Sequence, residues 1–332
     1  MLPTSPLGGL NGLEVQDKLP PVAVPLSEVG VVGVKVPLSF EDYKGRRIVV
    51  VPRFEAFIDL PAWRKGIHAS RQYETIIEVF SQFAGKAYRL ERVCAEMALE
   101  ILRRQKEASK AKVKASGDAI LEKTTPVSEH RSYEPYRLLA SAVAVKKPEG
   151  GVEITRKIGV KVEGVTACPC AQELLAFHAR AKLREKGFPN GTIDKVLRSV
   201  PLATHMQRSL GVLVTEVPGN REIDAFKLAE IVEESMSAPS YGLLKREDES
   251  AIVLRAAERA LFAEDAVRIM MKKFVEKYPN LPDKTRILFK VRSYESIHKH
   301  DFIAKKVISF GALKAELEAN RYDGGRPGGK IF

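Results

Sequence analysis

Hydrophobic and polar positions along the chain follow two periods. In 158–165 apolar residues alternate with polar or small ones, as expected for a half-buried strand. Elsewhere the apolar residues recur every three or four positions, which indicates amphipathic helices. The expected strands are 31–37, 47–58, 111–125, 133–145, 152–165, 209–217, 285–292 and 301–310, and the expected helices are 71–83, 86–106, 224–236 and 251–277.

The order strand, strand, helix, helix, strand, strand occurs twice. This order predicts an α+β fold of two tandem modules, each a mostly antiparallel sheet with its two helices on one face. Such sheets leave edges that must be paired or covered, so we expect several subunits to assemble into a ring or barrel. The expected division is an extended segment over 1–28, modules over 29–148 and 149–311, and a C-terminal helix with a flexible Gly-rich tail over 312–332.

Composition narrows the class of protein. The 332 residues are 45% hydrophobic, which suits a globular chain, and no apolar run is long enough to cross a bilayer. Three cysteines exclude a disulfide framework and fit a reducing compartment, so we expect a cytoplasmic protein without a membrane partner. The formal charge of +12 favours an anionic partner, either nucleic acid or a phosphorylated small molecule.

A pair of thiols follows the strand expected over 152–165. Cys168 and Cys170 bracket a proline on a turn, and His205 lies beyond a helix-like insertion, just before another strand. A thiol and an imidazole at two strand ends form a donor set for Zn²⁺ or Fe²⁺. They are too few for a structural zinc site, so carboxylates or water must complete the coordination. The alternative is a buried pair of bystander thiols, as we expect for Cys94 in the core stripe of the helix over 86–106.

One carboxylate interrupts an apolar helix face. Glu264 lies in a stripe that steps at three and four residues along 251–277. A carboxylate there must be paired with protein or must reach a ligand. A ligand with adjacent N–H donors, such as guanine, would satisfy both oxygens. The alternatives are a salt bridge to Arg268 or Arg259, or partial exposure of the carboxylate at the edge of the stripe.

Three further polar clusters lie at the ends of expected elements. The segment 243–249 holds two cations and three carboxylates before a helix, and it provides either a helix cap or a metal ligand. The segment 294–301 holds two acids and two histidines, and an acid and an imidazole three residues apart suit metal binding and proton transfer. The basic loop 64–71 enters a helix and resembles a phosphate cradle, although a solvated basic loop has the same composition.

Together these motifs resemble the metal-dependent GTP cyclohydrolases of type IB. The resemblance covers about 30–310, and the segment between Cys170 and His205 is similar to the archaeal branch that makes the methanopterin precursor. The motifs that carry it are Cys168-Pro169-Cys170, His205-x-Gln207-Arg208, Leu243-Leu244-Lys245-Arg246-x-Asp248-Glu249 and Glu295-Ser296-Ile297-His298-x-His300-Asp301. The sequence departs from the family pattern at Ala69 and Met206, which bears on phosphate binding but on no ligand.

The resemblance implies a tunnelling fold (T-fold) that assembles into a homotetramer with active sites between subunits. It also implies Fe²⁺ as cofactor, with Mn²⁺ or Zn²⁺ as alternatives. The implied roles are metal binding by Cys168, His205, Glu249 and Glu295, catalysis by His298 and Cys170, and substrate binding by Glu264, Arg71, Arg208, Lys245 and Arg246.

The implied reaction is hydrolysis of GTP at C8 with release of formate. The archaeal branch forms 7,8-dihydroneopterin 2′,3′-cyclic phosphate and pyrophosphate, whereas the bacterial type keeps the triphosphate. A nucleic-acid-binding protein would also explain the charge, but the basic residues are spread along the chain without interleaved aromatics. A protein with a purely structural metal would leave Glu264 and His298 without a role.

Overall fold

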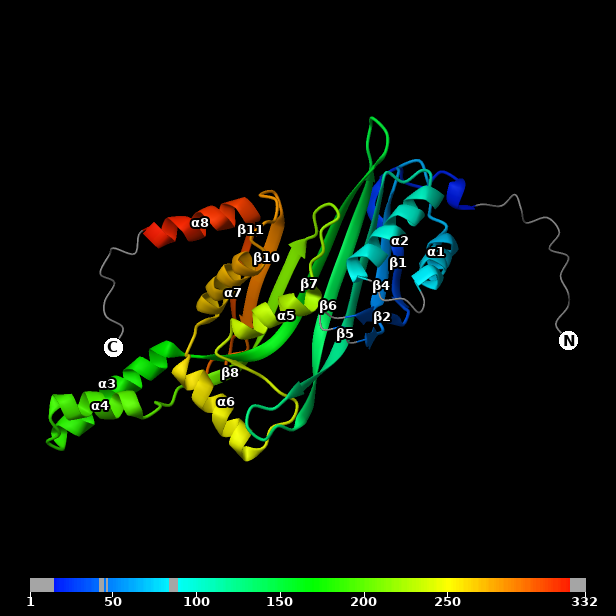
Figure 1. The fold of residues 1–332 in the computed structure, drawn as a ribbon. Helices are drawn as coiled ribbons and strands as arrows, with labels where there is room; N and C mark the ends of the chain where they lie inside the picture. The colour runs from blue at the N-terminus through cyan, green and yellow to red at the C-terminus, as the bar shows by residue number, and fades with distance from the viewer. Residues whose placement is uncertain (1–14, 42–44, 46, 84–88, 323–332) are drawn as a thin grey trace. The chain divides into compact units, whose positions relative to one another are not determined.

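The computed structural model describes residues 15–41, 45, 47–83 and 89–322 (Figure 1). It is an α+β structure with antiparallel strand pairs, and the chain divides into two compact units. The first unit comprises 1–39, 51–116 and 140–156, and the second comprises 40–50, 117–139 and 157–332. The expected module boundary at 148/149 stays a prediction. Among the described helices, none is long and apolar enough to cross a membrane.

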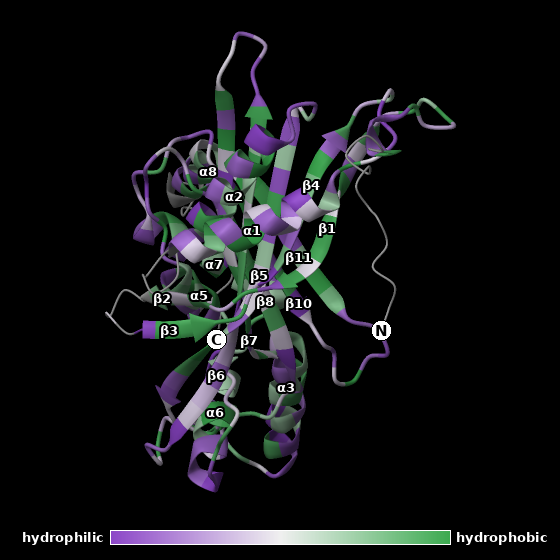
Figure 2. Cartoon of the chain, turned by 90° about the vertical axis from the view of Figure 1, so that its right-hand side faces the viewer, coloured by the Kyte–Doolittle hydropathy of each residue, from purple (hydrophilic) through white to green (hydrophobic). Residues whose placement is uncertain are grey.

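The first unit pairs its strands in the order β1-β4-β5-β6. Its helices carry hydrophobic and hydrophilic residues on the same element, as Figure 2 shows for α1. Cys94 is fully buried in α2, so it belongs to the core as expected, and burial raises the pKa of its thiol. The elements are β1 (Leu26–Lys35), β4 (Arg53–Leu60), α1 (Ala69–Phe83), α2 (Leu90–Arg104) and parts of β5 (Lys110–Thr124), β6 (Arg131–Lys146) and β7 (Val152–Ala167).

The second unit continues the order β5-β6-β7-β8-β10-β11, with β9 paired to β7. Helix α5 packs on β8, and α7 packs on β10 and β11. Gly211 on β8 permits this close packing, because a Cβ there would lie 2.3 Å from Val232 of α5. The remaining elements of this unit are β8 (Met206–Glu216), α5 (Ala225–Glu234), β9 (Ala238–Pro239), α6 (Arg246–Glu258), α7 (Ala263–Lys277), β10 (Arg286–Ser293), β11 (Phe302–Ser309) and α8 (Phe310–Tyr322).

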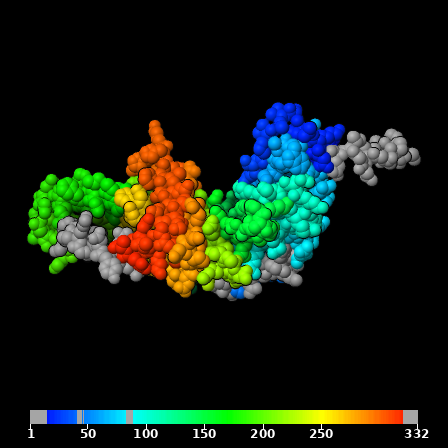
Figure 3. Space-filling model, turned by 90° about the horizontal axis from the view of Figure 1, so that it is seen from above, coloured from blue at the N-terminus to red at the C-terminus, as the bar shows by residue number. Residues whose placement is uncertain are grey.

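Two further helices, α3 (Pro169–Glu185) and α4 (Asn190–Ser199), form the expected helical insertion between Cys170 and His205. They extend away from the sheet of the second unit (Figures 1 and 3). Helix α3 buries none of its residues, and α4 buries only Ile193. The insertion therefore adds little to the core of the unit that carries it.

Two expected elements are each divided in the structure. The strand expected over 47–58 is β3 (Arg47–Val50), which pairs with β2 (Leu38–Glu41), followed by β4. Pro52 lies at the break and has no N–H to donate to a ladder. The helix expected over 251–277 is wrong as a single helix: α6 ends at Glu258 and α7 begins at Ala263. Leu261, between them, bridges to Ala167 at the end of β7.

This break changes the position of Glu264. The residue lies in the first turn of α7, and Val253, which the stripe places on the same buried face, is 55% exposed on α6. The apolar stripe is therefore not one continuous face. The terminal segments expected to be extended or flexible are in part outside the described residues, which begin at 15 and end at 322.

Candidate active site

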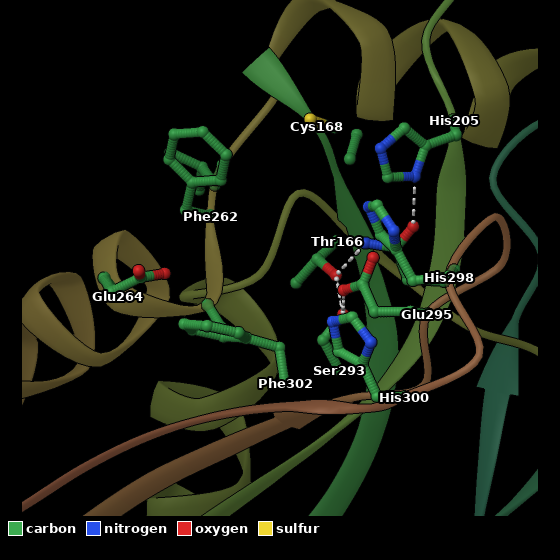
Figure 4. A pocket seen from close by; sticks show the side chains of 14 residues that line it. Thr166, Cys168, His205, Phe262, Glu264, Ser293, Glu295, His298, His300 and Phe302 are labelled. Carbon is green, nitrogen blue, oxygen red and sulfur yellow. Dashed lines mark hydrogen bonds between the residues drawn. The ribbon is translucent and has the colours of Figure 1, made fainter. Parts of the chain in front are cut away.

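A cavity of about 230 Å³ opens where β7, β8 and β10 end (Figure 4). The strand register brings three short polar side chains together there. Thr166 of β7 pairs with Gln207 of β8, and Ser209 of β8 pairs with Ser293 of β10. The other residues around the cavity are Ala167, Cys168, His205, Leu261, Phe262, Ala263, Glu264, Glu295, His298, His300 and Phe302.

Cys168 is fixed at the turn from β7 into α3. It is the N-cap of α3, and the N–H of Ala171 donates to its sulfur at 3.4 Å. The N–H of Cys168 donates to the carbonyl of His205 at 3.1 Å, and Thr204 donates its hydroxyl to the Cys168 carbonyl. Pro169 suits the first helical position because the N–H it lacks has no intrahelical partner there. These bonds hold the sulfur and the imidazole at the same end of the sheet.

A line of hydrogen bonds joins His205 to Glu295. His205 Nδ1 lies 3.0 Å from Gln207 Oε1, and Gln207 Nε2 donates to Thr166 Oγ1 at 3.2 Å. Thr166 Oγ1 lies 2.7 Å from Ser209 Oγ and 3.3 Å from Ser293 Oγ. Ser293 then donates to Glu295 Oε1 at 2.7 Å. The three hydroxyl residues are at most 2% exposed, so the middle of the line is buried, whereas His205, Gln207 and Glu295 are half-buried at the cavity.

Two imidazoles lie beside this line. The ring of His298 is 6.2 Å from that of His205, measured between centroids, and it stacks on His300 at 5.3 Å. Both come from the segment between β10 and β11, which leaves them exposed at the rim of the cavity. His298 is therefore close enough to exchange protons with a molecule bound against His205.

Glu264 lines the same cavity without an ion pair to any described side chain. Figure 4 shows it between Phe262 and Phe302. The two cations considered as partners are used elsewhere, since Arg268 pairs with Asp265 at 2.8 Å and Arg259 donates to the carbonyl of Glu234. The salt-bridge alternative for Glu264 is therefore wrong, whereas the alternative of partial exposure is confirmed, because the side chain is half-buried.

Asp248 is a structural cap in the second unit. Its carboxylate accepts hydrogen bonds from the backbone of Lys245, Val127 and Ser128 and from the Ser128 hydroxyl. Burial opposes ionisation of this group, but the hydrogen bonds outweigh burial and hold its pKa well below the usual range. The capping interpretation of 243–249 is thus confirmed for Asp248.

Other expected site residues lie away from the cavity lining. Arg208 is exposed, with a 3.8 Å ion pair to Glu163. The exposed side chain of Cys170 lies on α3, and that of Arg71 lies on α1 of the first unit. The remaining three, Lys245, Arg246 and Glu249, are exposed at the start of α6. Their proposed roles stay predictions.

The donor types around the cavity suit a borderline metal ion. Cys168, His205 and Glu295 supply sulfur, nitrogen and oxygen, a mixture that Fe²⁺, Mn²⁺ or Zn²⁺ accepts. Within the described part of the chain, however, no three Cys, His, Asp or Glu side chains lie close enough together to enclose an ion. The types of ligand therefore fit such an ion, whereas the described side chains do not lie close enough together to enclose it.

Several residues of the cavity were missed by sequence reasoning. The sequence analysis assigns no role to Thr166, Ser293, Phe262 and Phe302. It includes Gln207 in a motif but gives that residue no role. One signal could have found them: a hydroxyl residue at a strand position that the alternation of buried and exposed residues places inside, as for Ser293 in β10. Such positions are usually apolar, so a short polar residue there needs a partner.

An acid without an ion pair to a described side chain, two rim imidazoles and a thiol line one cavity, which makes this cavity the candidate active site. The family model described as type I GTP cyclohydrolase folE2 matches residues 13–304, and the chain belongs to this family. A protein of Methanothermobacter thermautotrophicus named GTP cyclohydrolase MptA is 40% identical over 306 residues, covering 92% of this chain and 96% of its own. The Methanocaldococcus jannaschii protein of that name is 37% identical, with 92% and 97% covered.

Solved structures are more distant. The uricase of Arthrobacter globiformis matches with a TM-score of 0.48 and 9% identity, covering 85% of this chain and 93% of that one.

Proposed function

We propose that this protein is a GTP cyclohydrolase of methanopterin-type pterin biosynthesis. It opens the guanine imidazole ring at C8, releases formate and forms 7,8-dihydroneopterin 2′,3′-cyclic phosphate with pyrophosphate. Membership of the family and the similarity to proteins named GTP cyclohydrolase MptA support the reaction class. The observation in the site that carries the proposal is the unpaired carboxylate of Glu264 in a cavity that also holds a thiol and imidazoles.

Glu264 would hold the guanine base. Its two oxygens accept from N1–H and the 2-amino group, a bidentate charge-assisted contact that adenine does not offer. Phe262 and Phe302 are 42% and 44% exposed beside it, so their rings are available to stack on the base. The cavity of about 230 Å³ is smaller than the roughly 300–1,000 Å³ of pockets for whole ligands. It therefore suits part of the nucleotide, and the phosphates extend beyond it toward basic residues.

The ligands that we propose for a metal ion are Cys168, His205, Glu295 and Glu249, with Fe²⁺ as the expected ion and Mn²⁺ or Zn²⁺ as alternatives. Such an ion lowers the pKa of a bound water and so supplies a nucleophile at neutral pH. The chain's own groups position the base and move protons. His298, at the rim, donates protons to the ring nitrogens and accepts protons from them. Two waters are consumed: the first opens the ring at C8, and the second releases C8 as formate. Cys170 would assist beside the reacting carbon.

The assembly that we propose is a homotetramer of T-fold subunits. Strand β11 ends the described sheet of the second unit, and its Ile303 and Val307 are 51% and 47% exposed. An edge with exposed β-branched residues favours pairing with another subunit. Assembly would also allow one subunit to contribute residues to the active site of another. The residues concerned are Arg71, Arg208, Lys245, Arg246 and Glu249. The cytoplasmic location expected from the cysteine content stays a prediction.

The deciding experiment is anaerobic incubation of metal-stripped protein with GTP. Fe²⁺, Mn²⁺ or Zn²⁺ is added in turn, formate is assayed enzymatically, and phosphorus products are followed by ³¹P NMR. Formate together with pyrophosphate supports the cyclic-phosphate reaction, whereas formate with a retained triphosphate assigns the bacterial-type product. Folded tetramer that yields no formate with any of the three ions refutes the assignment.

A further inference from the structure

We propose that Gln207 is a positioning residue: it fixes the proton of His205 on Nδ1 and so leaves Nε2 free to bind the metal ion. The proposal rests on the metal centre suggested above. It starts from the contact between His205 Nδ1 and Gln207 Oε1, which measures 3.0 Å. A neutral imidazole carries one proton, and the hydrogen bond made by one nitrogen decides which nitrogen stays available.

The direction of that hydrogen bond follows from the far end of the line. Ser293 donates its only hydroxyl proton to Glu295 Oε1 at 2.7 Å. Ser293 can then only accept from Thr166, at 3.3 Å. Thr166 has spent its proton and must itself accept, both from Ser209 at 2.7 Å and from Gln207.

Gln207 therefore presents its amide nitrogen to Thr166 and its carbonyl oxygen to His205. An acceptor at 3.0 Å requires a proton on Nδ1. If the amide were reversed, its oxygen would take the Thr166 proton and the bond from Thr166 to Ser293 would be lost. Only one orientation makes all five bonds, and in that orientation the carbonyl oxygen of Gln207 faces Nδ1 of His205.

Burial gives this assignment its force. Thr166, Ser209 and Ser293 are 1%, 0% and 2% exposed, so water does not compete for their hydroxyl groups. A buried network that is fully satisfied resists reorganisation, because each reversal leaves a donor or acceptor unpaired. The network also reaches both proposed ligands at opposite ends, His205 and Glu295, and so orients them together. Loss of such a supporting contact typically lowers metal affinity about 10–100-fold.

Three variants separate positioning from packing. Gln207→Leu removes the acceptor, whereas Gln207→Glu keeps an oxygen that accepts from Nδ1–H. Gln172→Leu is the matched control: the Gln172 amide donates to the carbonyls of Leu202 and Ala257 and does not line the cavity. It tests what the loss of a part-buried amide does to the fold alone.

Two measurements read the effect without turnover. Solid-state ¹⁵N NMR of ¹⁵N-histidine-labelled, metal-free protein gives the tautomer, with the His205 signal assigned by its loss in His205→Gln. Zn²⁺ affinity is measured by competition with a chromophoric chelator. We expect a protonated Nδ1 in wild type, Gln207→Glu and Gln172→Leu, and a mixture rich in protonated Nε2 in Gln207→Leu. Zn²⁺ affinity should fall about 10–100-fold in Gln207→Leu alone.

The proposal is overturned if wild-type His205 carries its proton on Nε2, or if Gln207→Leu keeps both the tautomer and the affinity of wild type. An equal loss of affinity in Gln172→Leu would also overturn it, because packing would then explain the effect. Failure of the proposed reaction is a separate outcome. If no formate is released, the NMR spectrum still tests the tautomer of His205. If formate is released, a proton found on Nε2 of His205 still overturns the role proposed for Gln207.

Discussion

Replacing Glu264 by glutamine tests the recognition of the base. Glutamine keeps the shape of the side chain but presents one oxygen and one amide donor where the carboxylate presents two acceptors. One of the two contacts that we propose to N1–H and the 2-amino group would then be lost, and the other would lose its charge. Hydrogen bonds to charged groups contribute about 1.5–3 kcal/mol. At about 1.36 kcal/mol per tenfold change, kcat/KM for GTP should fall about 10- to 150-fold.

The assay follows formate release from GTP and from inosine triphosphate, which has C8 and N1–H but lacks the 2-amino group. Wild type should prefer GTP, and Glu264→Gln should lose most of that preference, since the two changes remove the same contact. Asp265→Asn is the control: Asp265 is the next residue of α7 but pairs with Arg268 on the surface and does not line the cavity. The reasoning is refuted if Glu264→Gln matches Asp265→Asn in kcat/KM, or if its preference for GTP over inosine triphosphate is unchanged.

Two further predictions concern the framework. Hydrogen bonds lower the pKa of Asp248 in the folded protein, so the ionised carboxylate stabilises the fold above the pKa of about 3.9 that Asp has in the unfolded chain. This stabilisation is lost as the pH falls below that value. Asp248→Asn should therefore lower Tm at pH 7 more than the exposed control Glu247→Gln does, and the difference should shrink in acid; a difference that does not change with pH contradicts this. Gly30→Ala places a Cβ 1.8 Å from the carbonyl oxygen of Ala56 on the partner strand, so it should lower the free energy of unfolding, measured in urea, by about 1–3 kcal/mol or more. Gly191→Ala, whose Cβ meets open space, should change that free energy by less than about 1 kcal/mol. Similar unfolding midpoints for the two variants would show the steric argument to be wrong.

Strand and helix positions were predictable where local periodicity and burial agree. The stripe through Cys94 in α2 appears as expected, and the alternation over 158–165 lies in β7, which extends two residues further, to Ala167. The helix over 251–277 fails because periodicity does not register a tertiary contact. Leu261 leaves the helical path to bridge the end of β7, and nothing within the segment's own spacing marks that bridge. The stripe nevertheless drew attention to Glu264, although the two halves of that stripe lie on different helices.

The site was predictable as a set of reactive residues but not as a network. Cys168, His205, Glu295 and His298 carry recognisable chemistry. The first three stand beside strand ends, and His298 lies in the segment between β10 and β11. The hydroxyls of Thr166, Ser209 and Ser293 become partners only through the register of β7, β8 and β10, which is a long-range property of the sheet. A shift of one residue in either pairing would turn these side chains to the opposite face. The register that builds the core therefore also determines whether the hydrogen bonds that join Glu295 to His205 can form.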